Sequence, residues 1–194
     1  DQVDAGGLTN NTLIVFTSDN GGHSSVDSRF KTSGPLRGFK RDLTEGGIRV
    51  PFIARWPGTV PRNQVTDEVI AFQDMLPTFA DLAKTSVPQH VDGVSVVSVL
   101  KGGRQETPRE YLYWDVGHCR SRYDQAVRWK NWKGICLGVG SDIQLYDIGE
   151  TQDLAEEHPE VVQRIARIMG TAPSPSDRYR IGQIYKGKPL WKPN

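Results

Sequence analysis

The chain has 194 residues, 37% of them hydrophobic, and its 24 Lys and Arg against 23 Asp and Glu give a formal net charge of +1. These values predict a globular chain with one substantial core, or with one core and a small satellite domain, and they exclude recognition of nucleic acid or an anionic membrane through bulk charge. No apolar run approaches the roughly 18 residues that span a bilayer, so we expect no membrane partner. The only cysteines, Cys119 and Cys136, can form at most one disulfide bond, which the sequence leaves open.

The first clear pattern along the chain is "NTLIVFTSD". Such a run of apolar and β-branched residues is typical of a strand that is covered on both faces, and it predicts a central strand over residues 12–18 of a parallel or mixed sheet. The polar stretch "DQVDAGGLTNN" before it has neither the basic flank nor the apolar core of a signal peptide. Because this polar stretch leads directly into a buried strand, we expect the sequence to begin inside a longer protein.

Polar residues follow that strand at once, in "DNGGH". Neighbouring strand residues point to opposite faces, so Asp19 and Asn20 can face one atom only where the strand has become a turn. Gly21 and Gly22 are expected to allow the turn through positive φ angles. Carboxylate and amide oxygens suit Ca²⁺, with Mg²⁺ as the alternative, but the 6–8 oxygens around calcium require further ligands from elsewhere. The pair therefore predicts part of a metal site, with a simple Asx turn as the alternative.

A basic, glycine-rich loop comes next, in "GPLRGFKRDLTEGGIRVPFIARWPG", and returns into a predicted strand over 50–56. Lys40 in this loop carries a compact charge that can contact a tetrahedral anion, and the loop can bring it to the sheet edge that Asp19 occupies. A basic loop alone is usually only solvated. Together with the preceding polar pair, it favours an anion site beside a metal.

The remaining elements predict helices and a second sheet. "MLPTFADLAK" has helical spacing of apolar residues, with Asp74 or Thr78 as its cap. The aromatic-rich runs "YLYWDV", "QAVRWKNWKGICLG" and "IQLYDI" predict an antiparallel sheet, and "AEEHPEVVQRIARIMG" predicts a helix after it. We therefore expect an α/β core over 1–108, a small antiparallel sheet packed with a helix over 109–171, and an extended tail over 172–194.

In this order, the motifs resemble the C-terminal half of the sulfatases, which are members of the alkaline phosphatase superfamily. "TSDNGGH" and "GFKRDLTEGGIRVPFIARWPG" carry the resemblance, and it continues through "FQDMLPTFADLA" and "LYDIGETQDLAEEHPEVV". It implies the C-terminal portion of the α/β sulfatase fold, a mixed sheet with helices followed by the small antiparallel sheet. It also implies that Asp19 and Asn20 bind calcium and that Lys40 contacts the sulfate group. Glu45 and Arg49 are expected to form an internal ion pair, with a direct role in catalysis as the alternative.

The resemblance implies an arylsulfatase-like hydrolysis of sulfate esters, with a sulfated small molecule or glycan as the binding partner. Sulfatases use a formylglycine made from the Cys or Ser of a Cys/Ser-x-Pro/Ala-x-Arg motif. "CRSRY" at Cys119 has Ser121 and Tyr123 at two defining positions, and so fails the motif. We therefore expect the nucleophile in an N-terminal half of the same protein, which is the expected partner of a chain that is inactive alone. A periplasmic or secreted location is implied by the family only.

Three weaker candidates for substrate binding are His23, His118 and Arg120. His23 follows Asn20 closely and can hydrogen-bond a sulfate oxygen or a substrate hydroxyl, with an exposed turn histidine as the equal alternative. His118 and Arg120 can contact an anionic sugar, but a solvated loop explains them as well.

Two other functions remain open from the sequence. A phosphodiesterase or phosphonate monoester hydrolase of the same superfamily commonly binds zinc or manganese, and a non-catalytic binding module needs no nucleophile. The substrate and the oligomeric state are not fixed by the sequence.

Overall fold

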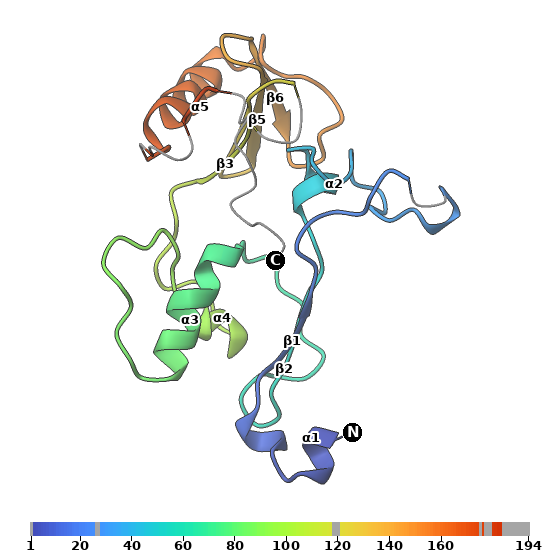
Figure 1. Cartoon of the computed structure of the whole chain (residues 1–194), viewed down its shortest axis with the longest axis vertical. Helices are drawn as coiled ribbons and strands as arrows, with labels where there is room; N and C mark the ends of the chain where they lie inside the picture. Colours follow the sequence, from blue (N-terminus) through green and yellow to red (C-terminus); the bar gives the residue numbers. More distant parts are fainter. Residues whose placement is uncertain (1, 26–27, 118–120, 175, 177–179, 184–194) are drawn as a thin grey trace, which may run out of the picture. The chain divides into compact units, whose positions relative to one another are not determined.

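A computed structural model describes residues 2–25, 28–117, 121–174, 176 and 180–183, which group into two compact units (Figure 1). Unit 1 combines Asp1–Thr17 with Pro51–Arg109, and unit 2 combines Ser18–Val50 with Glu110–Asn194. Both units are therefore discontinuous in sequence, whereas the predicted domains are contiguous. The predicted boundaries after residues 108 and 171 stay a prediction, and most of the predicted tail lies outside the described residues.

Unit 1 is built from short helices and one pair of strands. Its elements in chain order are α1 (Gln2–Ala5), η1 (Thr9–Asn11), β1 (Ile14–Thr17), β2 (Phe52–Arg55), η3 (Phe72–Asp74), α3 (Met75–Leu82) and α4 (Val97–Leu100). The helix predicted from "MLPTFADLAK" is confirmed as α3, which η3 precedes directly. No helix in the described part of the chain is long and apolar enough to cross a membrane.

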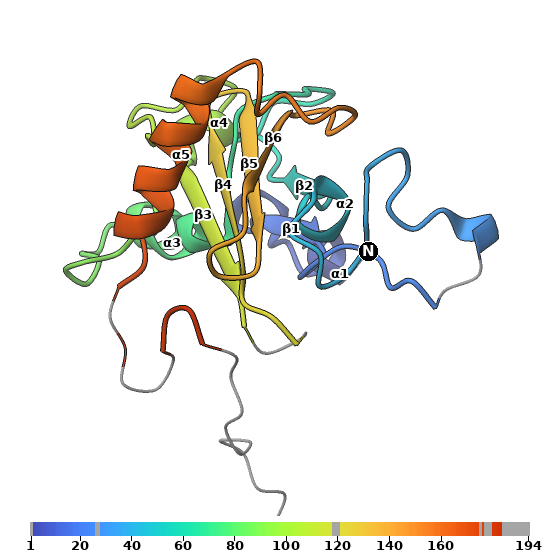
Figure 2. The ribbon, with the colours of Figure 1, turned by 90° about the horizontal axis from the view of Figure 1, so that it is seen from above.

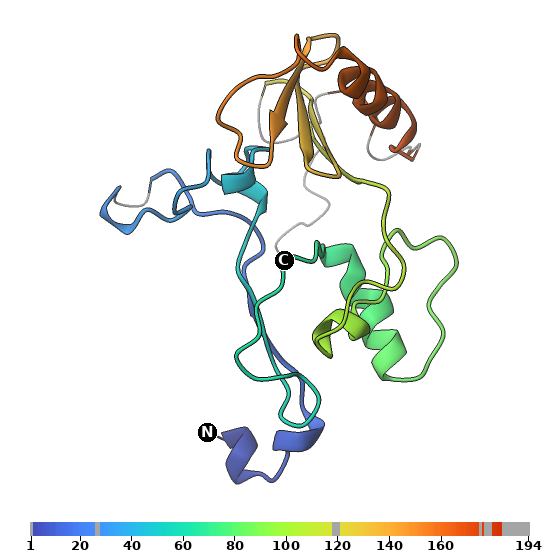
Figure 3. The same ribbon diagram turned by 180° about the vertical axis from the view of Figure 1, so that it is seen from behind.

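The two strands of unit 1 run side by side in opposite directions (Figure 3). β1 pairs with β2 alone among the described residues, and Phe16 lies opposite Ile53. Both side chains are exposed, Phe16 by 63% and Ile53 by 60%. The prediction of a central strand in a parallel or mixed sheet is therefore wrong for the described chain. The apolar run is suited to burial on both faces, but the described residues cover only part of it.

Unit 2 contains a four-stranded antiparallel sheet in the order β3-β4-β5-β6. Its elements are η2 (Ser28–Phe30), α2 (Glu45–Ile48), β3 (Leu112–Val116), β4 (Asp124–Trp129), β5 (Trp132–Leu137), β6 (Ile143–Asp147) and α5 (Pro159–Thr171). The predicted antiparallel sheet is confirmed, and the long middle run "QAVRWKNWKGICLG" forms two of its strands. α5 confirms the predicted helix, and Pro159 occupies its first turn, where a missing N–H is tolerated.

The sheet of unit 2 is covered on both faces, as Figure 2 shows. α5 packs on one face, where Val127 and Leu145 contact Ile165 in a fully buried cluster. The segment that leads into α2 covers the other face, where Leu43 packs with Ile135 in a second cluster. Because strand residues alternate between faces, each strand contributes to both clusters. The sheet thus packs against the glycine-rich loop through Leu43. The same loop carries Lys40.

Candidate functional site

The turn that follows β1 in the chain presents Asp19 and Asn20. Asp19 is exposed and Asn20 is half-buried. The Ser18 hydroxyl donates a hydrogen bond to the Asn20 carbonyl over 2.9 Å, which tightens the turn. The Gly21 N–H donates to the Gly47 carbonyl, also over 2.9 Å. The turn is therefore fastened to the glycine-rich loop directly after the two predicted metal ligands.

Lys40 lies beside the same turn. Its backbone N–H donates a hydrogen bond to the Gly22 carbonyl over 2.8 Å, and the residue is half-buried. Two backbone hydrogen bonds thus join the turn to the loop, one at Gly21 and one at Gly22. This arrangement places the predicted sulfate-binding lysine next to the predicted metal ligands. The roles of Asp19, Asn20 and Lys40 themselves stay predictions.

The glycines of the site are required by close backbone approach. A Cβ atom added at Gly21 would overlap the Gly46 carbonyl oxygen, and one added at Gly22 would overlap the Thr32 side chain. Neither Gly21 nor Gly22 has a positive φ, so the predicted reason for these glycines is wrong. The loop needs a positive φ elsewhere, at Gly38 with φ +81°. Glycine lets the turn and the loop approach each other closely.

Glu45, the first residue of α2, is 3% exposed and forms a buried ion pair that the sequence analysis missed. Its Oε1 accepts a hydrogen bond from Lys133 Nζ over 2.9 Å. The predicted partner, Arg49, lies at 4.0 Å from Oε2 and is exposed, so its contribution is small. Lys133 is 88 residues away in the chain, which left no local signal for this contact.

Glu150, just after β6, is the second buried carboxylate at α2. Its Oε2 accepts the Glu45 N–H over 2.9 Å, and Arg37 Nε lies 3.8 Å from the same oxygen. Its Oε1 is buried without a hydrogen-bond partner among the described residues. Burial raises the pKa of Glu150, and burial lowers the pKa of Lys133 although Glu45 opposes that shift. Burial of the Glu150 carboxylate and the Lys133 ammonium therefore costs free energy, and their ion-pair and hydrogen-bond partners offset part of that cost.

The weaker candidates are placed only in part. His23 is exposed, and its Nδ1 accepts the Ser25 N–H over 3.1 Å and lies 2.7 Å from Ser25 Oγ. His118 and Arg120 lie outside the described residues. Substrate binding by these three residues stays a prediction.

The side chains of the turn offer the type of ligand atom that a hard cation prefers, but they offer too few of them. Asp19 and Asn20 offer oxygens, which Ca²⁺ and Mg²⁺ prefer. Across the described ranges, no group of three or more His, Cys, Asp and Glu side chains could hold a metal ion. The two residues therefore fit one part of a calcium or magnesium site, with further ligands required from elsewhere.

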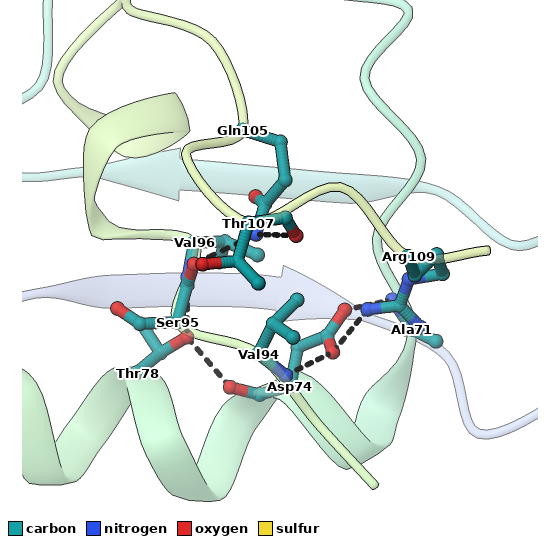
Figure 4. Close-up of polar contacts among 9 residues, drawn as sticks. All are labelled: Ala71, Asp74, Thr78, Val94, Ser95, Val96, Gln105, Thr107 and Arg109. Carbon is teal, nitrogen blue, oxygen red and sulfur yellow. Dashed lines mark hydrogen bonds and ion pairs between the residues drawn. The ribbon is translucent and has the colours of Figure 1, made fainter.

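A separate polar cluster lies within unit 1, around the fully buried Asp74 (Figure 4). Its Oδ2 accepts the Ala71 N–H over 2.7 Å, and its Oδ1 accepts the Val94 N–H over 3.0 Å and a hydrogen bond from Arg109. Asp74 or Thr78 was predicted to cap α3, but neither side chain does so, and the Asp74 carboxylate instead bonds backward to the N–H of Ala71, the N-cap of η3. Thr78 donates to the Asp74 carbonyl over 2.6 Å. These contacts fasten chain segments to one another, which is a structural role.

Comparison with known proteins identifies relatives of this chain. The family model for Sulfatase matches residues 1–85. Steryl-sulfatase from Homo sapiens is 39% identical over 129 residues, which are 63% of this chain and 21% of that enzyme. A crystal structure of Ps i-CgsB in complex with k-i-k-neocarrahexaose is 30% identical, has a TM-score of 0.74, and is matched over 88% of this chain and 38% of the other. The chain thus spans less than half the length of these relatives.

A phosphonate monoester hydrolase from Silicibacter pomeroyi also has a similar structure, with a TM-score of 0.68 and 20% identity over 88% of this chain and 36% of the other. At this identity, the likeness concerns the fold alone. The chain forms a portion of the fold that these enzymes share, mixed α/β with small antiparallel sheets.

Proposed function

This sulfatase-family chain aligns with a portion of full-length sulfatases, and we propose that the complete protein hydrolyses a sulfate ester of a carbohydrate. The observation that supports this function best is the pair of backbone hydrogen bonds, Gly21 to Gly47 and Lys40 to Gly22. They hold the loop of Lys40, the proposed sulfate-binding cation, beside the turn of Asp19 and Asn20, the proposed metal ligands. A carbohydrate substrate is supported by the similar structure that was solved with a neocarrahexaose.

In the proposed reaction, Lys40 binds an oxygen of the sulfate group through its ammonium. Its positive charge stabilises the negative charge that grows on that oxygen in the transition state, the kind of contribution that often dominates such transfers. Asp19 and Asn20 would hold Ca²⁺, or Mg²⁺ as the alternative, and the bound ion would supply further positive charge near the sulfate. The nucleophile, expected to be a formylglycine, belongs to the N-terminal half in this proposal.

In this proposal, the N-terminal half would also cover the apolar surface of unit 1. Phe72, Leu76 and Phe79 follow one another at helical spacing over η3 and α3, and each is about half exposed. Phe16 and Ile53 are exposed on the strand pair. Each square ångström of such surface gains about 25 cal/mol when it is buried, and exposed apolar patches usually mark a contact surface. We infer that another part of the complete protein covers these side chains.

The test compares the complete protein with the isolated 194-residue chain, using 4-nitrophenyl sulfate and a sulfated oligosaccharide. The complete protein should hydrolyse both in Ca²⁺ and lose activity after chelation, whereas the isolated chain should hydrolyse neither. Robust turnover by the isolated chain would overturn the proposed division of the site.

The same assay, extended by a phosphonate monoester as substrate and by metal analysis of the complete protein, separates the alternatives. A phosphonate monoester hydrolase would prefer a phosphonate monoester and contain zinc or manganese. A non-catalytic module would bind the sulfated oligosaccharide without turnover. A periplasmic or secreted location rests on the family alone and stays a proposal.

A further inference from the structure

The charged residues behind the site suggest a role for the sheet of unit 2. Lys133 on β5 is fully buried, and its Nζ contacts Glu45 and lies 4.8 Å from the centre of the Trp114 ring. A buried ammonium costs several kcal/mol unless it is paired, so an apolar residue would serve a purely structural sheet position better. The buried Lys133 ammonium therefore requires a carboxylate partner that is held in a fixed position.

That partner, Glu45, is fixed at two points. Lys133 holds its side chain, and Glu150 Oε2 accepts its backbone N–H over 2.9 Å. Lys133 lies within the sheet and Glu150 just beyond its last strand. The start of α2 is therefore held in position and orientation by the sheet.

α2 passes this constraint to the candidate site over a short path. The Gly46 N–H donates to the Arg37 carbonyl over 2.7 Å, and the Gly47 carbonyl accepts the Gly21 N–H. Gly46 packs so closely against Gly21 that no side chain fits between them. Gly21 follows Asn20 directly, so a displacement of α2 moves the turn that presents the predicted metal ligands.

Arg37 fastens the same loop a second time. Its guanidinium lies 4.2 Å from the centre of the Tyr146 ring, and its Nε lies 3.8 Å from Glu150 Oε2. Arg37 precedes Lys40 by three residues, and the Lys40 N–H donates to the Gly22 carbonyl. Both sides of the candidate site are thus attached to the sheet through the two buried charges.

We propose that Lys133 and Glu150 are positioning residues, which hold the turn of Asp19 and Asn20 in the geometry that binds the metal. This role rests on the proposed metal site. Groups that are hydrogen-bonded directly to metal ligands commonly affect affinity about 10–100-fold when they are changed, and Lys133 and Glu150 act one contact further away, through Glu45. The two residues contact neither substrate nor metal and act through α2.

The experiment measures binding of Ca²⁺ alone to the metal-free complete protein by titration calorimetry. Lys133→Met keeps the length of the side chain and removes its charge, and it should weaken binding about 10-fold or more. Lys130→Met is the matched control, because Lys130 is exposed at the turn between β4 and β5, over the Trp129 ring. The affinity of Lys130→Met for Ca²⁺ should equal that of the unchanged protein. A role in folding alone would lower the melting temperature without changing the affinity of the folded fraction.

Asp19→Ala separates the two proposals. If Asp19→Ala binds Ca²⁺ as tightly as the unchanged protein, the metal assignment fails and the positioning role fails with it. If Asp19→Ala loses binding while folded Lys133→Met keeps full affinity, only the positioning role is overturned. Should Lys133→Met fail to fold, Glu150→Gln decides, because it preserves the shape of the side chain and removes the charge that faces Arg37 Nε at 3.8 Å. It should weaken binding measurably, and an unchanged affinity would overturn the proposal.

Discussion

Lys133 and Glu45 form a buried ion pair, with 2.9 Å from Nζ to Oε1, between segments that lie 88 residues apart in the chain. The pair joins the middle of an antiparallel sheet to the loop that carries Lys40. It ties the stability of that loop to the stability of the sheet.

Glu45→Ala should lower the free energy of unfolding by about 3–5 kcal/mol, because it leaves the Lys133 ammonium buried without its carboxylate. The double variant Glu45→Gln/Lys133→Met should be more stable than the sum of its single variants predicts. Urea unfolding of the complete protein, followed by tryptophan fluorescence, measures both effects. Arg49→Ala is the control, since this exposed partner of Glu45 should contribute less than about 1 kcal/mol. If the losses of the two single variants simply add up in the double variant, the two side chains are not coupled and the prediction is wrong.

Gly21→Ala tests the close approach of the turn and the loop. The added methyl group would overlap the Gly46 carbonyl oxygen, so the turn must move. We expect a loss of about 1–3 kcal/mol in unfolding free energy, as in other overpacked sites, together with weaker Ca²⁺ binding.

Gly170→Ala is the control for that variant. Gly170 lies near the end of α5, and nothing lies within 4 Å of an added Cβ. Alanine there should stabilise the helix by about 0.5–1 kcal/mol. Equal effects of the two substitutions would show that the packing at Gly21 does not matter.

Asp74→Ala tests the polar cluster of unit 1. It leaves Arg109, whose side chain is only 14% exposed, without its carboxylate partner, and it leaves two backbone N–H groups without their acceptor. We expect a loss of about 3–5 kcal/mol in unfolding free energy. Asp81→Ala removes an exposed carboxylate that accepts the Ser95 hydroxyl, and should cost about 1 kcal/mol. Similar losses for both variants would contradict the assigned role of Asp74.

The sequence predicts those elements whose signal is local. Aromatic-rich, partly alternating runs predicted the sheet of unit 2, and the helical pattern of "AEEHPEVVQRIARIMG" predicted α5, with Pro159 in its first turn. The neighbourhood of Lys40 and the "DNGG" turn was also predicted, from one polar strand end and one basic loop. These signals lie within segments of about 10–20 residues, where spacing alone carries the information.

The rest depends on contacts between distant segments. The partner of Glu45 is Lys133 because two distant segments meet, and the obvious local candidate, Arg49, is exposed. Asp74 has the position of a cap for α3, yet its carboxylate is used by Ala71, Val94 and Arg109. In both cases, tertiary contacts determine the partner of the carboxylate, and these contacts cannot be read from a single sequence.

Glu150 gives a prediction about pH. Burial raises its pKa above the ordinary value of 4.5, so the folded state binds its proton more tightly than the unfolded state does. The stability that this proton contributes is present below pH 4.5 and is lost as the pH rises through the folded pKa. Glu150→Gln removes this dependence. The variant should therefore gain stability relative to the unchanged protein between about pH 4.5 and neutral pH.

Urea unfolding of both proteins across that range checks this expectation, because the other titrating groups cancel in the difference. If Glu150→Gln instead becomes less stable than the unchanged protein as the pH rises, the folded state favours the ionised form of Glu150, and the prediction is wrong.

The central claim is that Lys40 binds the sulfate group beside the metal ligands Asp19 and Asn20. Steady-state hydrolysis of 4-nitrophenyl sulfate by the complete protein tests it, with Lys40→Ala compared with Lys101→Ala, which removes an exposed lysine of unit 1. Lys40→Ala should lower kcat/KM by about 100-fold or more, as loss of one stabilising group in a transition state commonly does. Lys101→Ala should leave it unchanged. A folded Lys40→Ala variant with undiminished kcat/KM would contradict the claim.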